Sequence, residues 1–212
     1  MKLHIANKNY SSWSFRPWIA MTVKGVKFDE ELTPFLVDGP NPKYAAFSPT
    51  SLVPVLEDGN VRVWESLAIL EYLADRYPAR GFWPEKRGDR ALARSIANEM
   101  HAGFRALRNA CPMNMRRPPG RIFQSEEVRD NIARIETIWT QCVERSGGPF
   151  LFGEFCNADA MYAPVVSRFA TYLLSESKPV LAYMHAVRDL PAWKAWEKAA
   201  RAEIAVIPRD EI

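Results

Sequence analysis

The sequence predicts a small α/β domain followed by a larger all-helical domain. Strand and helix patterns alternate through the first eighty residues, whereas the chain after Pro84 carries four long helical patterns and no convincing strand. A stretch with Pro and Gly, residues 78–86, separates the two parts and is the expected linker. We therefore expect one domain over residues 1–80 and a second over residues 81–212.

The first domain opens with signals in the order strand, helix, strand. Leu3–Ala6 is a short apolar run that ends at a polar Asn-Lys-Asn stretch, which predicts a strand leading into a loop. Residues Ser14–Lys24 have helical apolar spacing and stop at Gly25, and Lys27–Thr33 alternates weakly, as a strand does. Residues 34–42, rich in Pro, Gly and Asn, are expected to form a loop.

The remainder of the first domain predicts two strands and a helix. Leu52–Leu56 and Val61–Trp64 flank an Asp-Gly turn, which is a strong hairpin signal. Ser66 then opens a helix that ends before Pro78. This order, with both halves packed on one sheet, is a thioredoxin-like plan.

The second domain consists of four long helical patterns and one shorter pattern. Prolines and a glycine between residues 112 and 120 separate the first pattern from the second. The long patterns are Arg87–Ala110, Ser125–Ser146, Asn157–Leu174 and Pro191–Ala202, and the shorter one lies near Lys178–Asp189.

Composition favours a cytoplasmic globular protein without a metal site. Apolar residues make up 48% of the chain, no apolar run approaches the roughly 18 residues that span a bilayer, and the N-terminus turns polar at Asn7. The three cysteines and three histidines lack metal-ligand or disulfide spacing. A net charge of +3 is too small to indicate a nucleic-acid partner.

Five arginines and no carboxylate lie between residues 100 and 125. Two interpretations stay open: a solvated basic face, or a pocket wall that favours anionic ligands. The arginines are Arg105, Arg108, Arg116, Arg117 and Arg121.

Two serines, Ser11 and Ser12, lie between a predicted strand and the helix that follows it. Serines at a helix N-terminus commonly cap the unpaired N–H groups there, but a hydroxyl at this position can also stabilise a thiolate. Lowering a thiol pKa by about two units from about 8.5 requires roughly 2.7 kcal/mol, and one hydrogen bond to a charged acceptor contributes about 1.5–3 kcal/mol. The sequence alone leaves both roles open.

Two further motifs complete a recognisable pattern. Val53-Pro54 enters a strand, and Glu65-Ser66 opens the next helix, where free N–H groups can bind a ligand carboxylate. A strand-to-helix serine, an apolar-Val-Pro turn and a Glu-Ser dipeptide, followed by a helical domain, resemble a glutathione transferase over essentially the whole chain. Residues 153–159 are similar to the family's capping-box motif, and residues 190–193 to the start of its last helix.

The resemblance implies a role for the serine loop. Ser11-Ser12-Trp13 with Arg16 is most similar to the Ser-Ser-Cys-x-x-Arg loop of zeta-class enzymes. By that match Ser11 is the first choice for the hydroxyl that stabilises the glutathione thiolate, with Ser12 close behind. Trp13 stands where that loop has cysteine, which weakens the transfer of isomerase activity, and it is expected to face the bound substrate.

The same resemblance assigns the glutathione-binding residues. Val53, before what the family makes a cis proline at Pro54, is expected to pair by its main chain with the cysteinyl unit. Glu65 and Ser66 are expected to hold the γ-glutamyl amine and carboxylate. Glu99 and His101 are also expected contacts, because they lie in a stretch that is similar to a Glu-x-His-x-x-Phe motif of beta-class enzymes. Leu52 stands where the family usually has a Lys or Gln that holds the glycyl carboxylate, so Lys43 is the candidate for that contact.

Three functions follow as hypotheses. The leading one is transfer of glutathione, as co-substrate, to a small electrophile, and the arginine cluster predicts a preference for anionic electrophiles. The alternatives are a glutathione-dependent cis–trans isomerase of the maleylacetoacetate type, which regenerates glutathione, and a non-catalytic binding protein of the same fold. The resemblance also implies a homodimer, whereas the small net charge and the short apolar runs predict no nucleic-acid or membrane partner.

Overall fold

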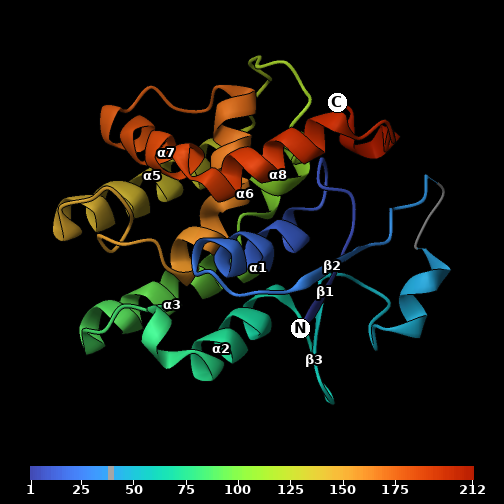
Figure 1. The fold of residues 1–212 in the computed structure, drawn as a ribbon. Helices are drawn as coiled ribbons and strands as arrows, with labels where there is room; N and C mark the ends of the chain where they lie inside the picture. Colours follow the sequence, from blue (N-terminus) through green and yellow to red (C-terminus); the bar gives the residue numbers. More distant parts are fainter. Residues whose placement is uncertain (38–40) are drawn as a thin grey trace.

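Four strands form one mixed sheet in the computed structural model, which describes residues 1–37 and 41–212 (Figure 1). The spatial order is β2-β1-β3-β4, with β1 parallel to β2 and antiparallel to β3, and with β3 and β4 paired as a hairpin. This is the predicted thioredoxin-like sheet. The strands are β1 (Lys2–Ile5), β2 (Asp29–Leu32), β3 (Val55–Asp58) and β4 (Val61–Trp64).

The hairpin has a shorter turn than the sequence suggests. β3 starts after Pro54 rather than at Leu52, because proline offers no N–H group to the strand ladder. It then continues to Asp58, so that only Gly59 and Asn60 connect the strands, and Gly59 supplies the positive φ (61°) that such a turn requires.

The loop predicted over residues 34–42 is only partly described. Residues 38–40 lie outside the described part of the chain. Its C-terminal end is ordered as a short 3-10 helix, η1 (Pro42–Ala46), which Asn41 caps by accepting a hydrogen bond from the Lys43 amide (3.0 Å).

Helices α1 (Ser12–Val23) and α2 (Ser66–Arg76) pack against the sheet through Leu3, Ile5 and Leu56. α1 also contacts helices of the second domain, which leaves it buried on nearly all sides. Figure 1 shows it between the sheet and the helical domain. The start of α1 is therefore fixed at the junction of the two domains.

The second domain is built from helices, as predicted, and residues 150–154 add two isolated β-bridges. A short 3-10 helix, η2 (Pro78–Arg80), lies in the predicted linker, and another, η3 (Pro208–Asp210), lies near the C-terminus. The helices are α3 (Arg87–Ala102), α4 (Arg105–Ala110), α5 (Glu126–Ser146), α6 (Asn157–Tyr172), α7 (Lys178–Asp189) and α8 (Pro191–Ala202).

The prediction of one continuous helix over Arg87–Ala110 is wrong. The helix is broken at Gly103 and Phe104, and Phe104 adopts a left-handed conformation with φ of 58°. A Cβ atom at residue 103 would lie 2.7 Å from the Glu99 carbonyl oxygen, so glycine permits a close approach of the backbone there. The break sends α4 in a new direction from the end of α3.

Helix α6 is the buried centre of the second domain. Asp159 accepts hydrogen bonds from the amides of Cys156 (2.9 Å) and Leu151 (3.1 Å), and it forms the predicted capping box with Cys156. Burial raises the pKa of Asp159 to about 6. Next to it, Asn157 joins the domains because its side chain donates to the Leu70 carbonyl (3.0 Å).

Within residues 1–37 and 41–212, every helix is too short or too polar to cross a bilayer.

Replacement of Asp159 by alanine is expected to destabilise the fold by about 2–4 kcal/mol, because two buried amides lose their acceptor. The free energy of unfolding, measured with denaturant at about pH 7.5, tests this value. The control is Asp189→Ala, which removes an exposed carboxylate that pairs with Lys194, and it should leave the free energy of unfolding nearly unchanged. Equal effects of the two substitutions would contradict the structural role of Asp159.

Candidate functional site

A cleft of about 930 Å³ opens between the two domains, within the size range of small-molecule sites. One wall comes from the first domain: the start of α1, the segment before β3 and the residue before α2. The other wall comes from the end of α3, from α4 and from residues 209–210 near the C-terminus. The second domain and the C-terminal residues therefore complete a site that the first domain begins.

The two serines of the first loop have different surroundings. Ser11 is the N-cap of α1, since its hydroxyl accepts from the Ser14 amide (3.3 Å) and donates to the Ser14 hydroxyl (2.7 Å). Ser12 is the first residue of the helix, and its hydroxyl makes no hydrogen bond to another described residue, although both serines line the cleft. The hydroxyl of Ser12 is thus free to donate to a ligand, whereas the hydroxyl of Ser11 is already engaged.

The segment before β3 presents free main-chain groups to the cleft. The peptide bond between Val53 and Pro54 is cis, and both residues line the cleft. Neither the amide nor the carbonyl of Val53 makes a hydrogen bond within the described part of the chain. These are the groups that an extended peptide needs for strand-like pairing.

The start of α2 carries an unusual backbone conformation and a buried hydroxyl. Glu65 precedes the helix with φ of 69°, a left-handed value that is uncommon for a non-glycine residue and that clusters at functional sites. The Ser66 hydroxyl is fully buried and has no hydrogen-bond partner among the described residues. A free hydroxyl at a helix N-terminus is suited to hold a carboxylate.

Trp13 is enclosed by cationic and aromatic groups. The guanidinium carbons of Arg16 and Arg108 lie 4.1 and 4.7 Å from its ring, and His101 meets it edge-on at 5.3 Å. Arg16 is fully buried and donates to the Met161 carbonyl of α6 (3.1 Å). These guanidinium groups give this end of the cleft a positive potential.

His101 faces the same region from the last turn of α3. Its Nε2 atom lies 3.8 Å from a carboxylate oxygen of Glu65, and the residue lines the cleft as the sequence suggests. Burial lowers the pKa of His101, and the charges of Arg16 and Arg108 act in the same direction, whereas Glu65 opposes them.

Three of the predicted site residues lie outside the cleft wall: Ser66, Glu99 and Lys43. Ser66 is fully buried behind Glu65, which does line the cleft. Glu99 forms a two-pronged ion pair with Arg134 of α5, at 2.7 and 2.8 Å, and does not line the cleft. Lys43 is exposed on η1 and is likewise absent from the lining.

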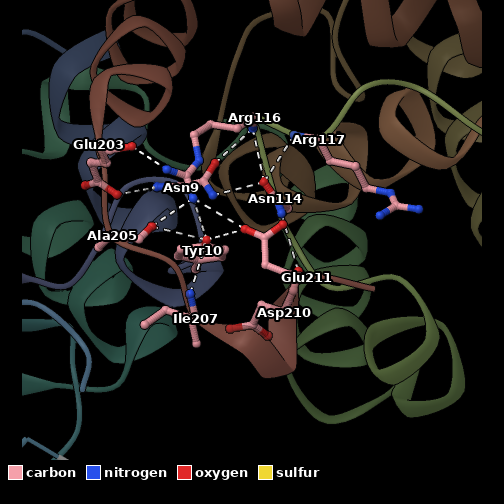
Figure 2. Close-up of polar contacts among 10 residues, drawn as sticks. All are labelled: Asn9, Tyr10, Asn114, Arg116, Arg117, Glu203, Ala205, Ile207, Asp210 and Glu211. Atoms are coloured by element: carbon pink, nitrogen blue, oxygen red, sulfur yellow. Dashed lines mark hydrogen bonds and ion pairs between the residues drawn. The ribbon is translucent and has the colours of Figure 1, made fainter. Parts of the chain in front are cut away.

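The C-terminal segment is a part of the site that sequence reasoning missed. Figure 2 shows Arg116 donating to the Tyr10 hydroxyl (2.6 Å) and to the Ala205 carbonyl (2.8 Å), and it shows Glu203 accepting from the Asn9 amide (3.1 Å). These contacts join residues about 90 to 200 positions apart, so no local motif signals them. They hold the end of the chain beside the start of α1.

All three cysteines are buried and unpaired in disulfides. Burial raises the pKa of Cys111 and of Cys142 to about 11, and raises that of Cys156 well above its ordinary value. In the described ranges no group of three or more His, Cys, Asp or Glu side chains could hold a metal ion.

Comparison with known proteins identifies the N-terminal part of the chain. Residues 10–76, which include α1, the Val53-Pro54 segment and α2, match the family description "Glutathione S-transferase, N-terminal domain". Residues 10–76 therefore carry a glutathione S-transferase N-terminal domain. The sequence resemblance on which the fold was predicted is thereby confirmed.

Individual relatives carry two kinds of name. A probable maleylacetoacetate isomerase of Vibrio cholerae is 31% identical over 102 residues, 47% of each chain. A glutathione S-transferase of Triticum aestivum is 27% identical over 195 residues, which cover 87% of this chain and 88% of that protein. The chain spans about half the length, 47–52%, of several other curated relatives that it matches.

The fold agrees with that of solved glutathione transferases. A glutathione transferase homolog from Burkholderia, crystallised with bound glutathione, superposes with a TM-score of 0.73 and 22% identity, over 95% of this chain and 98% of that one. At this identity the likeness concerns the arrangement of the two domains.

The charges around His101 predict opposite effects of two substitutions on its pKa. Glu65→Gln should lower the pKa further, because it removes the negative charge that favours the imidazolium. Arg108→Gln should raise it, because a repelling cation is lost. NMR titration of the His101 ring measures both shifts. The same direction of shift in both variants would contradict this electrostatic description of the site.

Proposed function

We propose that the protein is a glutathione transferase that ionises the thiol of glutathione in this cleft and joins the sulfur to a small electrophile. The observation that carries the proposal is that one cleft contains both the free Ser12 hydroxyl, at the start of α1, and the free main-chain groups of Val53. In this proposal Ser12, rather than the engaged Ser11, is the thiolate ligand.

The remaining groups of the cleft suit the rest of the tripeptide. The free amide and carbonyl of Val53 would pair with the cysteinyl unit, which puts the sulfur near the start of α1. The Ser66 hydroxyl and the N-terminus of α2 would hold the γ-glutamyl carboxylate, and the Glu65 carboxylate would hold the amine.

The energetics of thiol ionisation are compatible with these groups. A hydrogen bond from Ser12 to the sulfur contributes about 1.5–3 kcal/mol, and the helix N-terminus adds about 0.3–1 kcal/mol. The Trp13 amide, which has no partner in the described residues, is a second donor at the same helix end. The thiolate then attacks the electrophilic carbon, a sulfur–carbon bond forms, and the leaving group departs with its electron pair.

Substitution of the two serines tests which hydroxyl acts. Ser12→Ala should lose the ultraviolet absorbance of bound thiolate at neutral pH and reduce kcat by roughly 10–100-fold, as expected for one hydrogen bond to a charged acceptor. Ser11→Ala should keep the thiolate and instead lose about 0.5–2 kcal/mol of stability, because it removes a helix cap. The reverse pattern would assign the role to Ser11.

The second candidate is a glutathione-dependent cis–trans isomerase of the maleylacetoacetate type. Relatives with that name and the cationic groups at the α4 side of the cleft favour it, whereas Trp13 departs from the zeta-class loop. In that reaction the thiolate adds to a conjugated double bond, the new single bond rotates, and elimination releases glutathione. Measurement of glutathione after turnover separates the candidates, because only transfer consumes it.

A non-catalytic binding protein is the third candidate, and Leu52, with its hydrophobic side chain, favours it. Calorimetry that finds no binding of glutathione at millimolar concentration would favour this candidate. Binding together with the absorbance of a thiolate would favour an enzyme. A cytoplasmic homodimer, with a domain boundary near residue 80, completes the proposal.

The arginines of α4 predict a preference for anionic electrophiles. Arg105 and Arg108 line the cleft, so Arg105→Ala and Arg108→Ala should each raise KM severalfold for an electrophile that carries a carboxylate and leave KM for a neutral one unchanged. Arg121→Ala is the matched control, since Arg121 pairs with Glu176 on the surface and lies outside the cleft. The preference is refuted if Arg105→Ala and Arg108→Ala leave KM unchanged for both the anionic and the neutral electrophile.

A further inference from the structure

We propose that Arg209, near the C-terminus, binds the glycyl carboxylate of glutathione in this cleft. The inference rests on the proposed function and assigns a residue to the one part of the tripeptide that the site as described leaves without a partner. Leu52 is apolar and Lys43 lies outside the cleft wall, so neither supplies a charge there.

Residues 203–212, the C-terminal strap, are held firmly against the start of α1. The Glu203 carboxylate accepts hydrogen bonds from the Lys8 amide (2.7 Å) and the Asn9 amide (3.1 Å). Further along, the Ile207 amide donates to the Tyr10 hydroxyl (3.3 Å), which also contacts Glu211 (Figure 2). The strap is therefore a fixed part of the cleft wall.

Arg209 lies beside Phe35 on the cleft wall. Its guanidinium carbon is 5.8 Å from the ring of Phe35, and both residues line the cleft. Phe35 and Val53 pack against the same small apolar cluster, which includes Tyr44. Burial raises the pKa of Tyr44 to about 12, and the charge of Arg209 opposes this rise, which is a second sign that the two groups are close.

Most N–H donors of the Arg209 guanidinium are not engaged by described residues. Its Nε atom forms an ion pair with Asp210 at 3.8 Å, and the group makes no hydrogen bond to any residue of the described ranges. A guanidinium has five N–H donors, and two of them can bind one carboxylate in parallel. The terminal nitrogens of Arg209 are thus available to a ligand.

The distribution of charge in the cleft specifies which carboxylate would bind. The described residues of the lining include three arginines, of which Arg105 and Arg108 lie on α4, and Arg108 stacks on Trp13. If Glu65 and Ser66 hold the γ-glutamyl end and Val53 the cysteinyl unit, the tripeptide continues past Val53 toward Phe35. Its remaining carboxylate is the glycyl one, and the cation at that place is Arg209.

A comparison of two ligands isolates the contact. The first ligand is glutathione, and the second is its glycyl monoethyl ester, which lacks the negative charge at that end. Calorimetry on the full chain should give an affinity for glutathione about tenfold higher than for the ester. Arg209→Gln should weaken glutathione binding by about tenfold, leave ester binding nearly unchanged, and so remove the discrimination.

Lys43→Gln serves as the matched control, because Lys43 is the cation suggested by sequence and is exposed outside the cleft wall. It should leave both affinities unchanged. The inference is overturned if Arg209→Gln keeps the tenfold discrimination, if Lys43→Gln abolishes it, or if the unsubstituted protein binds both ligands equally. Absence of glutathione binding to the unsubstituted protein would instead refute the proposed function itself.

Discussion

The seating of helix α1 between the sheet and helix α6 is the constraint on which the site depends. Arg16, fully buried in α1, donates across the domain boundary to the Met161 carbonyl, so the helix cannot shift without exposing a charge to an apolar interior. The start of the same helix carries Ser12 and Trp13 into the cleft. A single buried contact thus sets the position of the groups that meet a ligand.

Backbone strain and unpaired polar groups occur together at the cleft. Glu65 holds a left-handed backbone, Ser66 buries a hydroxyl without a partner, and Val53 leaves its main chain unpaired. The strained backbone of Glu65 and the unsatisfied buried hydroxyl of Ser66 each cost about 1–3 kcal/mol in the isolated protein, whereas the main chain of Val53 lines the cleft. That all three line or adjoin one cavity is an argument for binding that does not depend on sequence similarity.

Local chemistry in the sequence was sufficient to predict most of the fold. The Asp-Gly turn, the Ser66 helix start and the capping box at Asp159 involve neighbours in the chain, and all appear as expected. The break after α3 was missed because its cause is the close approach of Gly103 to the Glu99 carbonyl, which periodicity does not reveal.

The site was predicted less completely for a similar reason. The cleft positions of Ser12, Val53 and His101 follow from motifs, whereas the choice between Ser11 and Ser12 depends on which hydroxyl Ser14 engages. The C-terminal strap depends on Arg116 and Glu203 meeting residues far away in the chain. Pairings over such separations are set by the packed structure and leave no local pattern.

The burial of the cysteines has a consequence for the proposed reaction with electrophiles. A compound that reacts with the thiol of a ligand also reacts with an accessible thiolate of the protein. Here Cys111, Cys142 and Cys156 are all buried with raised pKa values, so at neutral pH they present neither surface nor negative charge to such a compound. These three cysteine thiols are thereby protected against alkylation.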